Sequence, residues 1–519
     1  MSKSDTWIKG TVILAIAGLI GKVLGMVYRI PLQNLAGDEG LYIYQQVYPV
    51  ISLALILSIY SLPSAFSHVL TYYTSQNAQI RYKNVSVVFY LLVVIGFSLF
   101  LIIYFMAPLL VQLMGDSSLL WPLRSTSVLF LLIPVTAFFR GVFQFQQQTN
   151  VVALSQVIEQ FIRVILIVIS TIVIVHFNYS LYHIGWIASA STILGMIVAS
   201  AVLLIVFRKR NISNQQATDI NLRLILASLL TGIVIYSLTH ILHLIVQLVD
   251  VFTMINSLRH YGVTFEEAKI LKGIYDRGNP LIQLGLVFAA ALAFSIVPAV
   301  QNQEAIQSKQ SVWNQVFAFK LTLLFSLSAS AGLIAIMPLL NPLFYQSSDG
   351  TVAIQLMVVL VFLLSMIMTL SVMLQAHGVR LKQVKYLVLL FVIKAILNLI
   401  LIQQYGIVGA SVASIIAAIV VVIIFYKKWA SKLSLNGVYP FILKSVAIVF
   451  VMMLAVSSST SLLSLVIPTD ERVLLLLVVL GLCVMGVMIV IYLIYKWRLF
   501  TKEEQEILEG LPLINKLRK

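Results

Sequence analysis

Long apolar segments, repeated along the whole chain, constrain the fold more than any other feature of this sequence. A helix needs about 20 mostly apolar residues to cross the hydrocarbon core of a bilayer. The sequence therefore predicts an all-α integral membrane protein with fourteen transmembrane helices. The candidate segments lie near 8–32, 40–68, 85–113, 122–146, 153–177, 182–207, 222–249, 274–300, 314–338, 352–376, 383–403, 407–426, 439–464 and 473–497.

The composition excludes a water-soluble protein. Hydrophobic residues make up 61% of the 519 residues and charged residues only 10%, whereas a water-soluble surface needs about a quarter of its residues charged. The longest polar connections, 208–221 and 250–273, have room for a short surface helix but not for an enzyme domain. Cys483 is the single cysteine, which excludes disulfides and cysteine-based metal sites. No HExxH, GxSxG or phosphate-cradling glycine-rich motif occurs, so we expect no enzyme activity, cofactor or metal.

The distribution of basic residues predicts the orientation in the membrane. Lys and Arg number 34 against 18 Asp and Glu, and membrane proteins collect Lys and Arg in cytoplasmic loops. No stretch combines a basic face with stacking aromatics, so we expect no nucleic-acid partner. Alternating basic and acidic loops predict that both termini are cytoplasmic. The basic side carries Lys3, Lys9, Arg81, Lys83, Arg208, Lys209, Arg210, Lys309, Arg380, Lys382, Lys385, Lys427, Lys428, Lys432, Lys496, Arg498 and Lys519, and the other side Asp38, Glu39, Asp116, Asp349, Asp470 and Glu471.

Two internal echoes suggest that the chain is a parallel repeat. IYQQVYPVISL from Ile43 resembles IYDRGNPLIQL from Ile274, and Gln144 precedes Arg163 by the interval at which Gln375 precedes Lys394. Both echoes relate one helix to the sixth helix after it, which is typical of transporters; the alternative is repeated hydropathy without common ancestry. The predicted parts are a six-helix bundle at 1–207, a cytoplasmic linker at 208–221, a second six-helix bundle at 222–426, and two further helices with a cytoplasmic tail at 427–519.

Ionisable residues inside the predicted spans are candidates for a site, because each costs at least ~2.5–3.5 kcal/mol near the bilayer centre. Glu159 and Arg163 are spaced to neutralise each other on one helix, and Lys320 could extend its ammonium to the interface. Asp276 and Arg277 could cap a helix. The candidate substrate-binding residues are Lys22, Arg29, Arg140, Glu159, Arg163, Asp276, Arg277 and Lys394.

The excess of cations among these residues indicates an anionic substrate. Arg binds phosphate oxygens in bidentate fashion and keeps its proton when desolvated. A transporter of organic cations would instead use buried carboxylates, and the predicted spans contain few beyond Glu159, Asp250 and Asp276.

The first two predicted helices, KGTVILAIAGLIGKVLGMVYRIPLQNLAGDEGLYIYQQVYPV, resemble those of the polysaccharide-transport proteins of the MOP superfamily. This group contains the MurJ lipid II flippases and the relatives of stage V sporulation protein B. FFRGVFQFQQQTNVVALSQVIEQFIRV, from Phe138 to Val164, resembles the same group's fourth and fifth helices. The resemblance implies an alternating-access flippase in the bacterial plasma membrane, whose partners are membrane lipids and an undecaprenyl-linked oligosaccharide diphosphate. It also implies a lipid-tail groove formed by helices thirteen and fourteen.

The resemblance places Lys22, Arg29 and Arg277 in a central cavity. The second predicted helix, ISLALILSIY, lacks the cavity arginine of the MurJ pattern, and Lys22 replaces an arginine. Lipid II and other lipid-linked glycans, such as teichoic-acid or capsule units, therefore both remain open as substrates, with coupling to a monovalent cation or the membrane potential. The alternatives are a cation-coupled exporter of small organic molecules, a membrane-embedded transferase, and a non-transporting partner of a cell-wall or sporulation complex.

Overall fold

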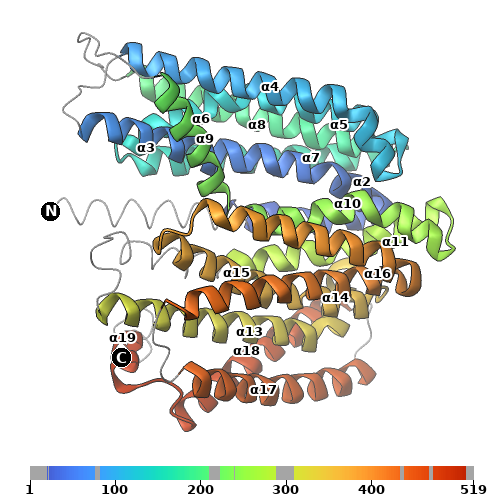
Figure 1. Cartoon of the computed structure of the whole chain (residues 1–519). Helices are drawn as coiled ribbons and strands as arrows, with labels where there is room; N and C mark the ends of the chain where they lie inside the picture. Colours follow the sequence, from blue (N-terminus) through green and yellow to red (C-terminus); the bar gives the residue numbers. More distant parts are fainter. Residues whose placement is uncertain are drawn as a thin grey trace. The chain divides into compact units, whose positions relative to one another are not determined.

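The chain folds into α-helices joined by short connections (Figure 1). The computed structural model describes residues 20–21, 23–75, 82–209, 222–238, 240–287, 309–432, 438–466 and 471–509, and these contain no β-strand. The all-helical class predicted from the sequence is therefore confirmed. The helices divide into two compact units, Met1–Leu284 with Arg380–Ala413 (unit 1) and Gly285–Val379 with Ser414–Lys519 (unit 2). The two predicted six-helix bundles remain a prediction.

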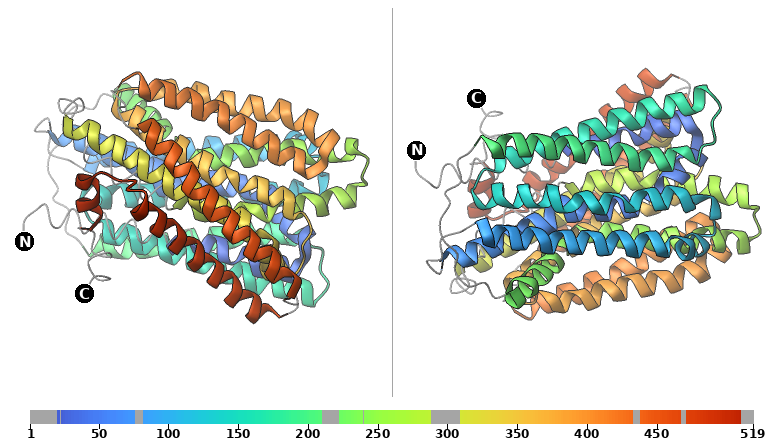
Figure 2. Two further views of the ribbon diagram at one scale, coloured as in Figure 1. Left: turned by 90° about the horizontal axis from the view of Figure 1, so that it is seen from below. Right: turned by 90° about the horizontal axis from the view of Figure 1, so that it is seen from above.

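Unit 1 holds most of the candidate site residues. In it α4, α6, α7 and α8 lie side by side (Figures 1 and 2). Helical residues at 20–21 and 23–27 precede α2, and a helix at 278–287 follows α11. In chain order, the elements of unit 1 are α2 (Arg29–Ile56), η1 (Leu57–Ser61), α3 (Leu62–Ser75), α4 (Tyr82–Met114), η2 (Ser117–Leu119), α5 (Leu120–Ser127), α6 (Leu129–Phe145), α7 (Thr149–His176), α8 (His183–Arg208), α9 (Leu222–Ser237), α10 (Ile241–Tyr261), α11 (Phe265–Asp276) and η4 (Leu381–Gln383).

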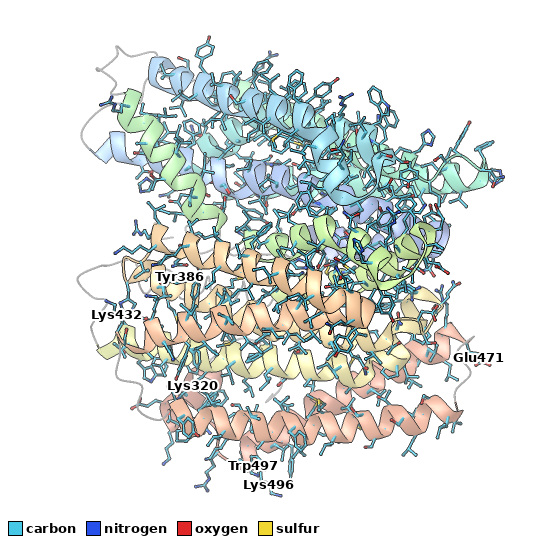
Figure 3. All side chains as sticks on the ribbon, turned by 45° about the vertical axis from the view of Figure 1, so that its right-hand side comes forward. Lys320, Tyr386, Lys432, Glu471, Lys496 and Trp497 are labelled. Carbon is cyan, nitrogen blue, oxygen red and sulfur yellow. The ribbon has the colours of Figure 1, made fainter. Side chains whose placement is uncertain are left out.

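Unit 2 contains α13 (Lys309–Tyr345), α14 (Thr351–Met357), α15 (Val359–Ala376), α17 (Val438–Val466), α18 (Arg472–Lys496) and α19 (Lys502–Glu509). The long helix α16 (Val384–Ala430) begins in unit 1 and ends in unit 2. Lys320 and Lys432 lie at one end of unit 2 and Glu471 at the opposite end (Figure 3).

Lys320 has a partner that the sequence did not predict. Its ammonium lies 2.6 Å from the carboxylate of Glu504 on α19, and the extension to the interface stays a prediction. Thr501 and Glu504 exchange hydrogen bonds at the start of α19, at 2.9 and 3.4 Å. This reciprocal capping fixes the carboxylate that holds Lys320.

Eleven helices among the described residues are long and apolar enough to cross a membrane. Two of them, Val23–Thr71 and Leu381–Ala430, each extend over two predicted segments. Each bends at a glycine with positive φ, Gly37 (69°) or Gly406 (56°), close to a predicted loop. Glycine permits such a bend because it has no Cβ. The predicted eighth segment is described only as far as residue 287, so the count of fourteen remains a prediction.

The polar connection predicted at 250–273 is wrong in extent. Helix α10 continues to Tyr261, and α11 begins at Phe265, which leaves a turn of three residues. Gly262 ends α10 in the left-handed conformation, and Thr264 with Glu267 forms a capping box at the start of α11. Three of the charged residues in this stretch, Asp250, Lys269 and Lys272, are instead buried in helices and paired, whereas Arg259, Glu266 and Glu267 are exposed.

Candidate functional site

Arg29 is the first residue of α2 and its guanidinium is buried. The residue is 0% exposed, and its guanidinium carbon lies 4.2 Å from the ring centre of Tyr48 and 5.8 Å from that of Tyr44. The Tyr28 hydroxyl lies beside it. Among the described residues, none of its three nitrogen atoms has a partner in hydrogen-bonding geometry, and no carboxylate lies within 4.0 Å. Cation–π contacts stabilise the charge only in part, since each is worth about 0.5–2 kcal/mol.

Three tyrosines surround this guanidinium. Tyr44 and Tyr48 are one helical turn apart on α2, with ring centres 5.5 Å apart. The rings of Tyr28 and Tyr44 meet edge to face at 5.7 Å, and their hydroxyl groups are hydrogen-bonded. All three side chains are buried. The four-residue spacing places Tyr44 and Tyr48 on one face of α2, where both reach Arg29.

A second guanidinium, that of Arg163 on α7, acts electrostatically on the same three tyrosines. Arg163 is 3% exposed and donates a hydrogen bond to Gln160, but its Nε and Nη1 atoms have no partner among the described residues. A Cβ at Gly25 would lie 3.5 Å from Arg163 Nη2, in ordinary van der Waals contact, so Gly25 lies against this guanidinium. We call Arg29, Arg163, Tyr28, Tyr44 and Tyr48 the arginine–tyrosine cluster. Its unmatched N–H donors fit an anion, phosphate in particular.

Arg277 belongs to the predicted cavity set, but a carboxylate neutralises it. Its Nε and Nη2 atoms donate to the two oxygens of Asp38, at 2.8 and 2.6 Å. Lys269 makes a parallel contact with Glu39 at 2.6 Å. The sequence predicts that Asp38 and Glu39 lie in a loop on the acidic side of the membrane. The bend at Gly37 carries them onto α11, where the missing side chain of Gly273 makes room for the Asp38 carbonyl.

Asp276 and Lys394 are also paired. Lys272 lies 2.5 and 2.6 Å from the two oxygens of Asp276, one helical turn away on α11. Lys394 on α16 lies 2.6 Å from Asp250 on α10. Sequence reasoning found no acidic partner for Lys394 because the partner is 144 residues away.

Arg140 and Glu159 form a further buried ion pair, at 2.6 Å. Arg140 also donates to Ser155 (3.1 Å) and to the hydroxyl of Ser58 (3.0 Å) in the π-helical turn η1. The interpretation that Glu159 pairs with Arg163 is therefore corrected, because Glu159 lies against α6. Of the remaining candidates, Lys22 lies outside the described residues.

Comparison with known proteins finds relatives along the whole chain. The model of the family described as "Polysaccharide biosynthesis protein" matches residues 7–304. The chain is 34% identical over 527 residues to the uncharacterized membrane protein YabM of Bacillus subtilis (strain 168), covering 99% of this chain and 96% of that protein. It is 28% identical over 206 residues to stage V sporulation protein B and over 218 residues to lipid II flippase MurJ of the same organism, about two fifths of each chain in both cases.

Solved structures share the fold at lower sequence identity. The lipid II flippase MurJ in an inward closed conformation matches with a TM-score of 0.68 and 15% identity, covering 94% of this chain and 99% of that chain. An inward-facing multidrug resistance MATE family transporter of the MOP superfamily matches with a TM-score of 0.57 and 17% identity, covering 83% and 99%. At these identities the likeness concerns the fold alone.

Proposed function

We propose that this chain, which belongs to the polysaccharide biosynthesis protein family of the MOP superfamily, is a flippase. Its proposed substrate is an undecaprenyl-linked anionic oligosaccharide. The relatives support the general function of a multi-pass transporter or flippase of this superfamily. The proposed substrate class includes lipid II and related cell-wall or capsule glycans. The proposed site of action is the bacterial plasma membrane, with both termini in the cytoplasm.

The arginine–tyrosine cluster carries this proposal. Its two guanidinium groups are buried without an ion-pair partner among the described residues, whereas the other buried cations described above each have a carboxylate. A diphosphate offers the planar pairs of oxygens that a guanidinium binds in bidentate fashion. At an effective dielectric of about 20, one such contact at 4 Å is worth up to ~4 kcal/mol before desolvation costs. The tyrosine hydroxyl groups add donors for the remaining phosphate or sugar oxygens.

Arg277 and Lys22 complete the proposed substrate contacts. In the present arrangement Arg277 is held by Asp38, so a substrate phosphate would have to compete with that carboxylate. We therefore assign first contact with the diphosphate to Arg29 and Arg163, and a later contact to Arg277. Exchange of Arg277 between Asp38 and substrate would connect binding to the movement between inward-open and outward-open forms.

The test is transbilayer movement of an undecaprenyl-diphosphate-linked oligosaccharide in proteoliposomes. Arg29→Ala and Arg163→Ala are each expected to slow transport at least about tenfold, which corresponds to ~1.4 kcal/mol of lost binding to the transport intermediate. Arg29→Lys keeps the charge but loses the bidentate geometry and should be intermediate. Arg208→Ala is the matched control, because Arg208 is exposed at the end of α8. Wild-type rates in both buried-arginine variants would refute the proposal.

A cation-coupled exporter of small organic molecules is the second candidate, because the MATE transporter shares the fold. Such a protein needs buried carboxylates free to bind a cation. Glu159, Asp250 and Asp276 are each already ion-paired with a side chain of the same unit. Uptake of an organic cation by the same proteoliposomes, with no movement of the lipid-linked glycan, would establish this candidate instead.

A further inference from the structure

The buried pair of Asp250 and Lys394 has no role in the substrate contacts proposed above. Asp250 lies on α10 and Lys394 on α16, and both are almost completely buried, at 3% and 1% exposure. Lys394 Nζ lies 2.6 Å from Asp250 Oδ2 and 2.7 Å from the main-chain oxygen of Val246. The ammonium is therefore held by a carboxylate and a carbonyl one helical turn apart.

Asn398 contacts the same carboxylate from α16. Asn398, one turn after Lys394, donates to Asp250 Oδ1 and to Thr253 Oγ1, each at 2.9 Å. Its own amide oxygen is buried and has no hydrogen-bond partner among the described residues. Carboxylate, carbonyl, hydroxyl and amide oxygens are the ligands that hard cations take in proteins, and main-chain carbonyls coordinate sodium in transporters. The carboxylate and the carbonyl that hold the ammonium are thus ligands that a cation uses, and the unpartnered amide oxygen of Asn398 lies on the residue that contacts the same carboxylate.

The surrounding charges favour a single positive charge at this position. Tyr275 donates to Asp250 at 3.2 Å, and Lys272 and Asp276 on α11 are the other charged groups that act on Lys394. Lys272 and Asp276 neutralise each other. One carboxylate, that of Asp250, remains for one monovalent charge. A divalent ion would leave an excess positive charge next to Lys272, which is costly in a buried site.

We infer that Lys394 is a built-in counter-cation, whose ammonium occupies a monovalent-cation position formed by Asp250, Val246 and Asn398. The protein then needs no dissolved Na⁺ or K⁺ at this position, and shortening the side chain opens a latent site for such an ion. The expectation that transport needs no Na⁺ or K⁺ at this position rests on the proposed function. The expectation that a shortened side chain lets such an ion bind does not. Ammonium and alkali ions can exchange in this way because both are compact single charges that oxygen atoms coordinate.

The test is thermal unfolding of the purified protein in NaCl, KCl and choline chloride at equal ionic strength. Lys394→Ala is expected to lower the unfolding temperature by several degrees in choline, because Asp250 is left buried without its partner. In Na⁺ or K⁺ the variant should recover at least half of that loss. Asp250→Asn combined with Lys394→Ala removes the carboxylate and should respond to none of the ions. Lys320→Ala is the control. It also removes a buried ammonium that binds a carboxylate, but no main-chain oxygen is described beside that ammonium. This variant should have the same unfolding temperature in all three salts.

Several outcomes would overturn the inference. One is a wild-type protein that has a higher unfolding temperature, or a higher transport rate, in Na⁺ or K⁺ than in choline. Another is a Lys394→Ala variant that recovers equally in choline, or that fails to fold even in Na⁺ while the double variant folds. The unfolding measurement requires no substrate. A protein that shows the ion response but moves no lipid-linked glycan would therefore contradict the proposed function and leave this inference standing.

Discussion

At the scale of single residues, the buried cations of unit 1 divide into two classes. Arg140, Arg277 and Lys394 each bind a carboxylate at 2.6 Å. Arg29 and Arg163 lie against tyrosine rings or an amide. Paired charges maintain the fold, because loss of one partner leaves the other buried and uncompensated. An unpaired charge has no such structural role, which is why we assign the substrate to it.

This division predicts opposite effects on stability. Arg140→Met should destabilise the protein by about 3–5 kcal/mol, because Glu159 is then buried without a partner. Adding Glu159→Gln should restore most of that loss. Arg29→Met, which removes a desolvated and unpaired charge, should leave thermal stability unchanged or raise it while transport falls. Thermal unfolding in detergent measures all three variants, and equal destabilisation by Arg140→Met and Arg29→Met would remove the basis for the distinction.

The charged residues of the candidate site were recognisable from the sequence, but their partners were not. Intramembrane charge alone singled out Arg29, Arg163 and Lys394. Spacing suggested that Arg163 pairs with Glu159, and the structure gives Glu159 to Arg140 instead. The partners that matter are far apart in the chain, 239 residues for Arg277 and Asp38. One sequence contains no signal for contacts of this range. The tyrosines were missed because Tyr44 and Tyr48 read as ordinary apolar positions of a span.

At the scale of secondary-structure elements, glycines decide where long helices bend and touch. The hydropathy of 23–71 predicted two helices, and the structure joins them through a bend at Gly37. That bend brings Asp38 onto α11, so an apparent loop residue becomes an ion-pair partner. The polar stretch 250–273 was likewise interpreted as a loop, because composition does not reveal that Asp250 and Lys272 are neutralised inside helices.

Gly273→Ala tests the contact between α2 and α11. A Cβ at Gly273 would lie 2.0 Å from the Asp38 carbonyl oxygen, so the two helices must move apart. We expect a loss of about 1–3 kcal/mol in unfolding free energy, the usual cost of overpacking, and weaker transport because Arg277 loses its aligned partner. Gly332→Ala on α13 is the matched control, since nothing lies within 4 Å of its Cβ. That change should be neutral or stabilising by up to about 1 kcal/mol. Similar unfolding of both variants would mean that the helices tolerate separation.

At the scale of the whole molecule, hydropathy and charge predicted the class of protein but not how its helices divide into two compact units. The all-helical class with long apolar segments and the family were evident from apolar segment length and the quoted helix sequences. Compact units that combine Met1–Leu284 with Arg380–Ala413 were not evident, because they depend on contacts of α16 with α10. The parallel repeat, with Pro49 equivalent to Pro280, remains a prediction.

The orientation in the membrane also remains a prediction, and unit 2 offers matched positions to test it. Ser348, beside Asp349, lies in the turn between α13 and α14, and Ser431, beside Lys432, follows α16; both are exposed. Acidic and basic residues thus mark different connections, and Lys432 lies at the end of unit 2 opposite Glu471 (Figure 3). Lys and Arg remain on the cytoplasmic side during insertion.

In a Cys483→Ser background, Ser348→Cys should therefore react with an impermeant thiol reagent added to intact cells. Ser431→Cys should react only after the cells are permeabilised. Both changes replace an exposed serine near the end of a helix, so reagent access, rather than burial, decides the outcome. Permeabilised cells, in which both cysteines should be labelled, provide the control for reactivity. The reverse pattern in intact cells would place the basic loops outside and refute the predicted cytoplasmic termini.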